Sequence, residues 1–458
     1  MRPISVLFTN NTLGLRAGSE IYVRDVALSL QRRGHRPMAF SLVMGPVAAE
    51  LRAATIPVVD DVTRIAERPD VIHGHHHFET LIAALAFPET PVVNFCHGWV
   101  PWEEMPLLHP AVRRYVAVDE VCVDRLVREE GIAAELIELL LNFVDLDRFR
   151  SRSPLPALPA RALVLSNAAT VDGYAGVIAA ACQSAGVKLD IVGGAAGNSS
   201  DTPETLLAGY DLVFAKGRSA LEALAVGCAT VVADWAGAGP LVTPDNYERL
   251  RRRNFGIREL QHAHDVAWYR EQIGQYCSAT AAEVSRRVRD EAGMPSAIDR
   301  LLAIYGAAMG TPPGAGAASA AAARHLSRIG RPIKDAYELG VRMKVRDADL
   351  AVARSALDAS SQRIRALESS IGALESSSRA LESSSRAHES SAGVLELELR
   401  AREQELATAR HQVEELRQQL AAVQSVATLR IRDAVLRMPL VGQAMHAGAR
   451  RLAQLLRS

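Results

Sequence analysis

The segment Lys216–Asp234 restricts the fold of this chain more than any other stretch of its sequence. A short apolar run, Leu212–Phe214, precedes it, and a second apolar run, Thr230–Ala233, lies near its end. Between the two runs, a glycine and two basic residues lead into a helical pattern that carries one acidic residue. Strand, turn, helix and strand in this order predict a βαβ unit in a parallel sheet. The turn of such a unit lies at the carboxyl edge of the sheet, where open α/β folds bind their ligands.

The residues of this turn suit a negatively charged ligand. Free backbone N–H groups and the positive end of the helix dipole favour an anion at a helix N-terminus. Lys216 and Arg218 would add full positive charge, and Glu222, one turn into the helix, is placed to accept hydrogen bonds from sugar hydroxyls. The same spacing also fits an ordinary βαβ crossover with an exposed basic pair and a solvated glutamate.

The alternation of strands and helices extends over about 300 residues. Ile4–Thr9 reads as a strand and Ser19–Arg33 as an amphipathic helix, and further pairs continue to residue 150. A connector with three prolines, residues 153–159, interrupts the pattern before it resumes. We therefore predict two Rossmann-like, doubly wound α/β domains, at 1–150 and 160–308, facing a cleft that binds ligands.

The remainder of the chain has a different composition. Residues 309–335 are rich in Ala, Gly and Pro and predict a flexible linker. Apolar residues then recur in heptads over 340–427, which predicts a long α-helical coiled coil and, most simply, a parallel homodimer. A low-complexity helix without a partner is the alternative. The basic amphipathic tail, 428–458, fits either a peripheral contact with an anionic membrane or a packing helix.

The overall composition excludes several classes of protein. Lys+Arg and Asp+Glu both number 52, which disfavours a nucleic-acid-binding protein. The five cysteines lack CxxC spacing, which disfavours a disulfide framework or a zinc site. The chain does not begin with a signal-peptide pattern, and no run approaches ~18 apolar residues. We expect a cytoplasmic protein, in contact with the inner face of the membrane if the tail binds there.

Four clustered histidines raise the question of a metal site: His73, His75, His76 and His77. Successive side chains of a strand point to opposite faces, so neighbouring histidines cannot all face one ion. No cysteines or acidic cluster adjoin them in the sequence. We therefore predict no metal site.

Several short motifs occur in an order that points to one family. They are Ala17-Gly18-Ser19-Glu20 with the following helix, Pro69–His76, Cys96-His97-Gly98-Trp99, Leu141–Phe149, Leu189–Gly194 and Glu222–Gly227. Together they resemble glycosyltransferases of the two-Rossmann-domain (GT-B) architecture, and within these the large retaining group numbered family 4. The resemblance covers residues 4–305.

The resemblance implies a role for each matching residue. Glu222 would hold the ribose hydroxyls of a nucleotide-diphosphate sugar, and His97 would lie near the transferred sugar. Gly18 and Ser19 would approach the donor phosphate or the acceptor. The diphosphate would rest on the backbone N–H groups of the turn, which comprises Gly217, Arg218, Ser219, Ala220 and Leu221. For His97, a purely structural place in the core is the alternative.

The chemistry implied by the resemblance is simple. The leaving group is a diphosphate, so the enzyme mainly stabilises the charge that develops on it. Paired carboxylates of the hydrolase kind are not needed. Cations and helix N-termini can act without a metal or a cofactor.

The sequence also departs from the family pattern. Phe214 occupies the position of a second family glutamate, eight residues before Glu222. The arginine and lysine that usually follow the first strand of the second domain are replaced by residues 166–169, Ser-Asn-Ala-Ala. We infer that Lys216 and Arg218 take over from the lost cations.

Three functions remain open on this basis. The first is a hexosyltransferase-type, retaining and metal-independent enzyme that builds a cell-surface or secreted polysaccharide or glycoconjugate from a nucleotide-sugar donor and a glycan or lipid-linked acceptor. The second is a nucleotide-sugar epimerase, which would require acidic groups in the cleft that the sequence does not place there. The third is a degenerate, non-catalytic GT-B domain that serves as a coiled-coil scaffold, an interpretation favoured by Phe214.

Overall fold

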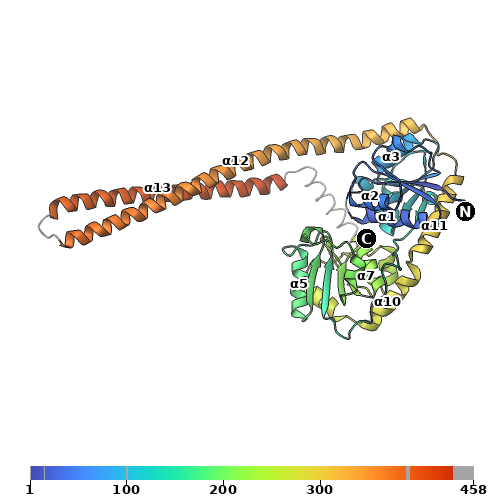
Figure 1. Cartoon of the computed structure of the whole chain (residues 1–458), viewed down its shortest axis with the longest axis horizontal. Coiled ribbons are helices and arrows are strands. Elements are labelled where there is room, and N and C mark those ends of the chain that lie inside the picture. The colour runs from blue at the N-terminus through green and yellow to red at the C-terminus, as the bar shows by residue number, and fades with distance from the viewer. Residues whose placement is uncertain (1, 15, 100–101, 388–391, 437–458) are drawn as a thin grey trace. The chain divides into compact units, whose positions relative to one another are not determined.

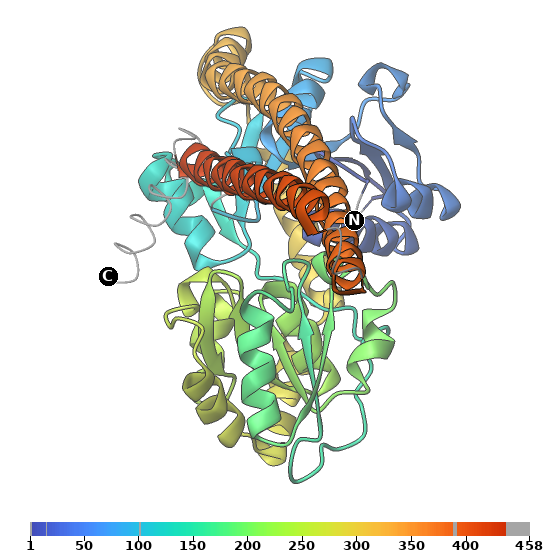
Figure 2. The same cartoon turned by 90° about the vertical axis from the view of Figure 1, so that its left-hand side faces the viewer.

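The computed structural model of the chain describes residues 2–14, 16–99, 102–387 and 392–436 (Figure 1). It divides into two compact units, Met1–Leu326 and Ser327–Ser458. The first unit holds two α/β lobes, and Figure 2 shows helices on both sides of the sheet in each of them. In the described residues, no helix is both long and apolar enough to cross a membrane.

The first lobe is built on a seven-stranded parallel sheet with the strand order β3-β2-β1-β4-β5-β6-β7. Its central strands are buried along their whole length, as expected of a parallel sheet covered on both faces. The strands are β1 (Ser5–Thr9), β2 (Arg36–Phe40), β3 (Val58–Val59), β4 (Val71–His75), β5 (Val92–Cys96), β6 (Val112–Ala117) and β7 (Ile137–Leu139). The α-helices are α1 (Gly18–Arg32), α2 (Pro46–Ala53), α3 (His77–Ala86) and α4 (Glu120–Asp124).

The second lobe has a five-stranded sheet with the order β12-β11-β10-β8-β9, in which only the edge strand β12 is antiparallel. The strands are β8 (Arg161–Leu165), β9 (Lys188–Val192), β10 (Leu212–Ala215), β11 (Ala229–Asp234) and β12 (Gly237–Leu241). The helices are α5 (Tyr174–Ser184), α6 (Pro203–Leu207), α7 (Gly217–Val226), α8 (Tyr247–Arg252), α9 (Val266–Gly274) and α10 (Ser278–Glu291). The predicted fold class, two doubly wound α/β lobes, is confirmed.

Helix α11 (Met294–Gly310) lies in the core of the first lobe, although we predicted a second domain that extends to residue 308. Ile298, Leu301 and Tyr305 form its buried stripe and pack against β4, β5 and β6. The stripe shows from sequence that one face is buried, but it does not show which sheet covers that face.

The segment that we predicted as a flexible linker, 309–335, is mostly helical. Gly314 N–H donates to the Pro110 carbonyl (3.0 Å), and Arg113 Nε donates to the Thr311 carbonyl (3.1 Å), so the first residues of the segment lie against the first lobe. Helix α12 (Ala318–Ala387) begins within it. Alanine has the strongest helix propensity of all residues, and this run of alanines therefore starts a helix.

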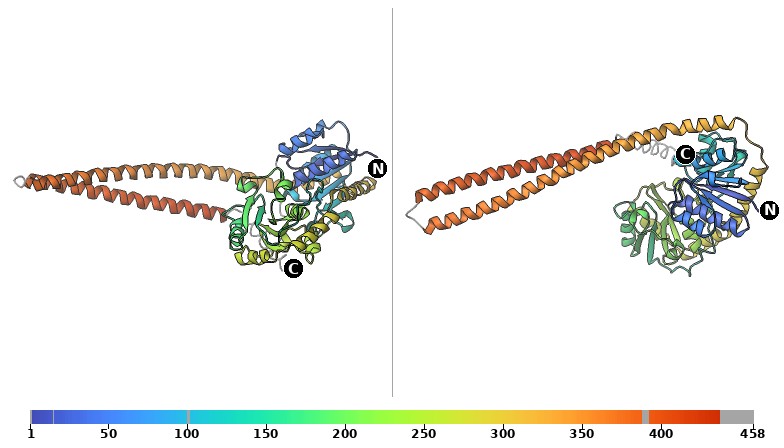
Figure 3. Two further views of the ribbon diagram at one scale, coloured as in Figure 1. Left: turned by 60° about the horizontal axis from the view of Figure 1, so that its bottom comes forward. Right: turned by 45° about the horizontal axis from the view of Figure 1, so that its top comes forward.

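The second unit is a pair of long helices, α12 and α13 (Ala392–Leu436), which run side by side in both views of Figure 3. Arg417 pairs with Glu368 (2.6 Å) and Arg410 with Glu375, so a step of seven residues forward on α13 is a step of seven back on α12. The helices are therefore antiparallel. The long helix predicted from the heptads is confirmed, but its seam pairs within one chain, whereas we predicted a parallel dimer. Oligomerisation stays a prediction, and most of the predicted tail (437–458) lies outside the described residues.

Candidate functional site

A cavity of about 430 Å³ lies between the two lobes of the first unit, at the N-terminus of α7. The first lobe contributes Arg16, Gly18 and Ile21 to its wall. The second lobe contributes Arg218, Ser219 and Glu222 from α7 and the glycine pair after β9. The cavity thus brings together Gly18, Arg218, Ser219 and Glu222, which the sequence predicted as site residues.

Arg218 joins the lobes across this cavity. Its guanidinium Nε donates to Glu222 Oε1 (2.7 Å) on the same helix, and its terminal nitrogen pairs with Asp25 on α1. Burial opposes its charge, yet the carboxylates of Asp25 and Glu222 raise the pKa of Arg218. For Glu222, burial outweighs the attraction of Arg218 and raises the pKa of the carboxyl. A largely buried arginine side chain, 15% exposed, is therefore held between one carboxyl group from each lobe.

The first turn of α7 is only partly free for a ligand. Gly217 has a positive φ of 60° and its N–H donates to the Phe255 carbonyl (3.1 Å), while Lys216 pairs with Asp234 at the end of β11. No side chain caps the helix. Ala220 and Leu221 are fully buried in the core of the second lobe. Of the predicted diphosphate cradle, Arg218 and Ser219 line the cavity, whereas Ala220 and Leu221 do not.

Asp25 is the centre of an ion-pair network that the sequence did not predict. Besides Arg218, it pairs with Arg24 (2.6 Å) and lies 3.7 Å from Arg148, and its side chain is 5% exposed. Burial opposes ionisation, but Arg218 and Arg24 outweigh it and lower the pKa of Asp25. Arg148 also pairs with Glu204 (3.0 Å) of the second lobe. The network ties both lobes together at the rim of the cavity.

His97, which follows β5, is partly buried in the first lobe near the same arginine. Its backbone N–H donates to Glu104 (2.9 Å), and its ring stacks on His75 (4.5 Å between centroids, 8° between planes) and meets Tyr22 edge-on (4.9 Å). Burial lowers the pKa of His97 to about 4, so its imidazole is neutral at pH 7. In the part of the chain that the structure describes, His97 Nε2 and the Tyr22 hydroxyl are buried without a hydrogen-bond partner.

Comparisons with known proteins agree with this arrangement. Residues 16–148 match the family model described as Glycosyltransferase Family 4. A glycosyltransferase from Rickettsia africae is 14% identical, with a TM-score of 0.52 over 68% of this chain and all of the other. HepE from Anabaena, solved in complex with UDP and glucose, is 15% identical, with a TM-score of 0.50 over 66% of this chain and 98% of the other. This chain has the GT-B glycosyltransferase fold.

A putative UDP-N-acetylglucosamine 2-epimerase from Listeria monocytogenes also matches, at 14% identity over 69% of this chain and all of the other. Its TM-score is 0.43. No curated protein matches the sequence of this GT-B chain.

The clustered histidines of this GT-B chain point in different directions. His73 and His75 share one face of β4. Their rings stack with centroids 4.6 Å apart, and their Nε2 atoms share a hydrogen bond of 2.7 Å. His76 has a positive φ of 59°, and its Nδ1 accepts a hydrogen bond from the Asn11 N–H (3.2 Å). His77 lies on α3. Among the described residues, no group of three His, Cys, Asp or Glu side chains is arranged to hold a metal ion.

Three buried carboxyl groups lie around these histidines: Glu20, Glu79 and Glu104. Glu104 Oε1 lies 3.6 Å from His76 Nε2, and burial raises the pKa of Glu20 and of Glu79. No local sequence pattern groups these three residues, because they come from α1, α3 and the segment after β5.

The residues that depart from the family pattern, Phe214 and residues 166–169, have clear places in the structure. Phe214 is fully buried in β10 and meets Tyr269 edge-on (5.7 Å), so its side chain belongs to the core of the second lobe. Where the family carries cations, Ser166 Oγ lies 3.4 Å from Asp234 and Asn167 lines the cavity. Arg218 also lines the cavity, whereas Lys216 does not.

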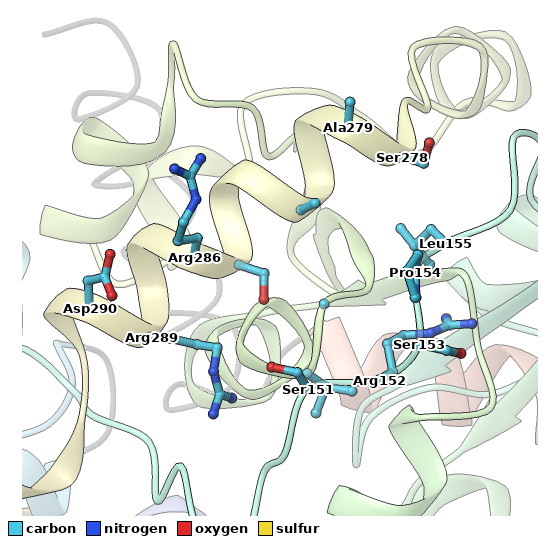
Figure 4. A pocket seen from close by; sticks show the side chains of 14 residues that line it. Ser151, Arg152, Ser153, Pro154, Leu155, Ser278, Ala279, Arg286, Arg289 and Asp290 are labelled. Carbon is cyan, nitrogen blue, oxygen red and sulfur yellow. The ribbon is translucent and has the colours of Figure 1, made fainter.

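A second cavity, of about 600 Å³, lies at the opposite end of α7 (Figure 4). The segment Ser151–Leu155 faces α10 across it. Two of the three arginines that line the cavity are held by the protein itself: Arg289 donates to the carbonyls of Phe149 (2.9 Å) and Ala225 (3.1 Å), and Arg152 pairs with Asp211 (3.0 Å). The negative end of the α7 dipole also points here, which disfavours an anion.

Proposed function

We propose that this chain transfers a sugar from a nucleotide-diphosphate sugar to a glycan or lipid-linked acceptor in the synthesis of a cell-surface or secreted glycan. One observation carries the proposal: Glu222 and the N-terminus of α7 open into a cavity walled by both lobes. The UDP in the Anabaena structure supports a nucleotide as the ligand of this fold.

In this proposal the donor lies along α7. Glu222 accepts hydrogen bonds from the ribose hydroxyls, and the N–H groups of Arg218 and Ser219, with the helix dipole, face the diphosphate. Arg218 exchanges a carboxylate for the diphosphate when the donor binds. Because its partners Asp25 and Glu222 are negatively charged, a phosphate oxygen can take the place of either one.

The first lobe contributes the groups that face the sugar. His97 is neutral at pH 7, so its Nε2 can donate to a sugar hydroxyl or accept from one. The charge that develops on the leaving diphosphate is stabilised by Arg218, by Lys216 if its pair with Asp234 opens, and by the helix N-terminus. We propose a retaining, metal-independent reaction that uses no cofactor beyond the donor.

A specific observation also favours the second candidate, a nucleotide-sugar epimerase. Epimerisation requires acid and base groups near the sugar, and Glu20, Glu79 and Glu104 surround His76 and His97 at the carboxyl ends of β4 and β5. Two of these carboxyl groups have a raised pKa, as expected of acid–base residues.

Calorimetric titration of the chain with a panel of nucleotide-diphosphate sugars tests the leading proposal. We expect one donor to bind, and Glu222→Ala to weaken its binding by ~1.5–3 kcal/mol, the scale of hydrogen bonds to a charged group. Glu248→Ala, at an exposed position on α8, is the control and should bind as the native chain does. If no donor binds, the scaffold interpretation replaces the transferase.

The epimerase is separated from the transferase by incubation with the bound donor alone. A transferase without acceptor leaves the donor sugar unchanged or hydrolyses it slowly, whereas an epimerase converts it to an isomer. Detection of an isomerised nucleotide-sugar by chromatography would therefore reject our leading proposal.

A further inference from the structure

The N-terminal part of α12, residues 327–346, exposes large apolar side chains to solvent. The exposed fractions are 47% for Ile333, 74% for Tyr337, 44% for Val341 and 58% for Val345. These residues follow one another at intervals of four, so they form a continuous, slowly turning stripe on the helix. We call Ile333, Tyr337, Val341 and Val345 the apolar stripe.

The centre of the apolar stripe faces away from the seam between α12 and α13. Every seventh residue from Ala353 to Leu367 is half-buried, which marks the seam with α13, and Leu339 occupies the same heptad position nearer the N-terminus of α12. Tyr337 and Val341 lie two residues before and two after Leu339, which is about 200° around a helix. A partner helix on the seam therefore leaves the centre of the stripe uncovered.

The same segment is strongly basic, unlike the rest of α12. Residues 327–346 hold six basic and two acidic side chains, whereas residues 347–387 hold five basic and six acidic ones. The basic residues are Arg328, Arg331, Lys334, Arg342, Lys344 and Arg346. An apolar stripe flanked by lysine and arginine, whose long side chains can reach an interface, is typical of helices that lie on anionic bilayers.

We propose that residues 327–346 of α12 bind the surface of an anionic lipid bilayer through the apolar stripe and the basic side chains beside it. A second copy of the chain fits this surface less well, because two segments of like charge would repel each other. The proposal does not depend on the glycosyltransferase activity. A chain that binds no donor could still bind lipid, so the two ideas fail separately.

Sedimentation of the full chain with lipid vesicles tests the proposal. We expect binding to phosphatidylcholine vesicles that contain about one third phosphatidylglycerol, weaker binding at high salt, and little binding to pure phosphatidylcholine. A triple variant, Arg331→Gln, Lys334→Gln and Lys344→Gln, should lower the partition coefficient by about 100-fold, since each basic residue contributes about fivefold.

The matched charge control removes three basic residues farther along the same helix: Arg354→Gln, Arg363→Gln and Arg365→Gln. Because this part of α12 has no excess of positive charge, we expect its binding to fall far less than that of the first variant. Equal losses in both triple variants would overturn the proposal, since binding would then depend on total charge alone.

A second variant tests the apolar stripe itself: Ile333→Ser, Tyr337→Ser and Val341→Ser. We expect it to lose binding to anionic vesicles while circular dichroism shows the same helix content and sedimentation the same oligomeric state. If it instead changes the oligomeric state and keeps its vesicle binding, the stripe is a contact between copies and the lipid proposal is wrong.

The basic tail is the competing source of lipid binding. A variant with Arg450→Gln, Arg451→Gln and Arg457→Gln should keep most of its binding if residues 327–346 make the contact. Loss of binding in the tail variant, together with normal binding of the Arg331, Lys334 and Lys344 variant, would overturn the proposal.

Discussion

The two ends of α7 each face a cavity that contains arginines, but the arginines are held in different ways. At the N-terminal end, Arg218 pairs with carboxylates from both lobes, which a phosphate could replace. At the C-terminal end, Arg289 donates to backbone carbonyls, which no ligand can replace without disturbing the fold. The chemistry of the partners, more than the size of the cavity, therefore separates a candidate binding site from a structural contact.

The largest expected effect is on stability, at the centre of the N-terminal network. Asp25→Asn removes the carboxylate that Arg24 and Arg218 share, so only Glu50 and Glu222 are left to balance the positive charge of these two arginines. We expect the free energy of unfolding to fall by about 3–5 kcal/mol, measured by urea denaturation. Asp299→Asn, which removes the carboxylate of an exposed ion pair with Arg33, should cost less than about 1 kcal/mol. Equal losses in both variants would show that Asp25 is not a buried hub.

The second prediction concerns the reaction rate. Arg218→Ala should lower kcat with a suitable acceptor by about 10²–10³-fold, the scale of losing one preorganised group that stabilises the transition state. Arg218→Lys keeps the charge but cannot contact two oxygens in the same way, and we expect it to restore only part of the rate. A full rate in Arg218→Ala would remove this arginine from the catalytic site.

The fold and part of the site could be predicted from sequence, for identifiable reasons. The continuous apolar run Leu212–Phe214 forms the buried parallel strand β10, and the start of α7 was found from its own local pattern. The partner of Arg218 was not found, because Asp25 precedes it by 193 residues and no local pattern links the two. The position of α11 was missed for the same reason, since its apolar stripe does not encode which lobe covers it.

The third prediction is the counterpart of the second at the other end of α7. Arg289→Met removes hydrogen bonds to the carbonyls of Phe149 and Ala225. We expect the free energy of unfolding to fall by about 1–3 kcal/mol, because buried carbonyls lose their donors. Donor affinity in calorimetry should stay unchanged. A weaker donor affinity in a variant that remains folded would show that the two ends of α7 are not independent.

The smallest expected effect is a loss of stability just below neutral pH, and it should come from the histidines of the first lobe. Burial lowers the pKa of His97 to about 4 and the pKa of His73 and His75 well below the ordinary value of about 6.5. Below about pH 6.5 the unfolded chain therefore takes up protons that the folded chain does not, and stability is lost as the pH falls toward 4.

Urea midpoints at pH 7, 6 and 5 measure this loss, and His97→Gln separates it from other acid effects. Because arginines lower the pKa of Asp25, the stability that this carboxylate contributes is lost only below about pH 4. A loss of stability between pH 7 and 5 therefore points to the histidines. The glutamine variant should lose less stability over this range than the native chain. His411→Gln, at an exposed position on α13, should follow the native chain. An identical pH dependence in all three proteins would mean that His97 is not buried as a neutral imidazole.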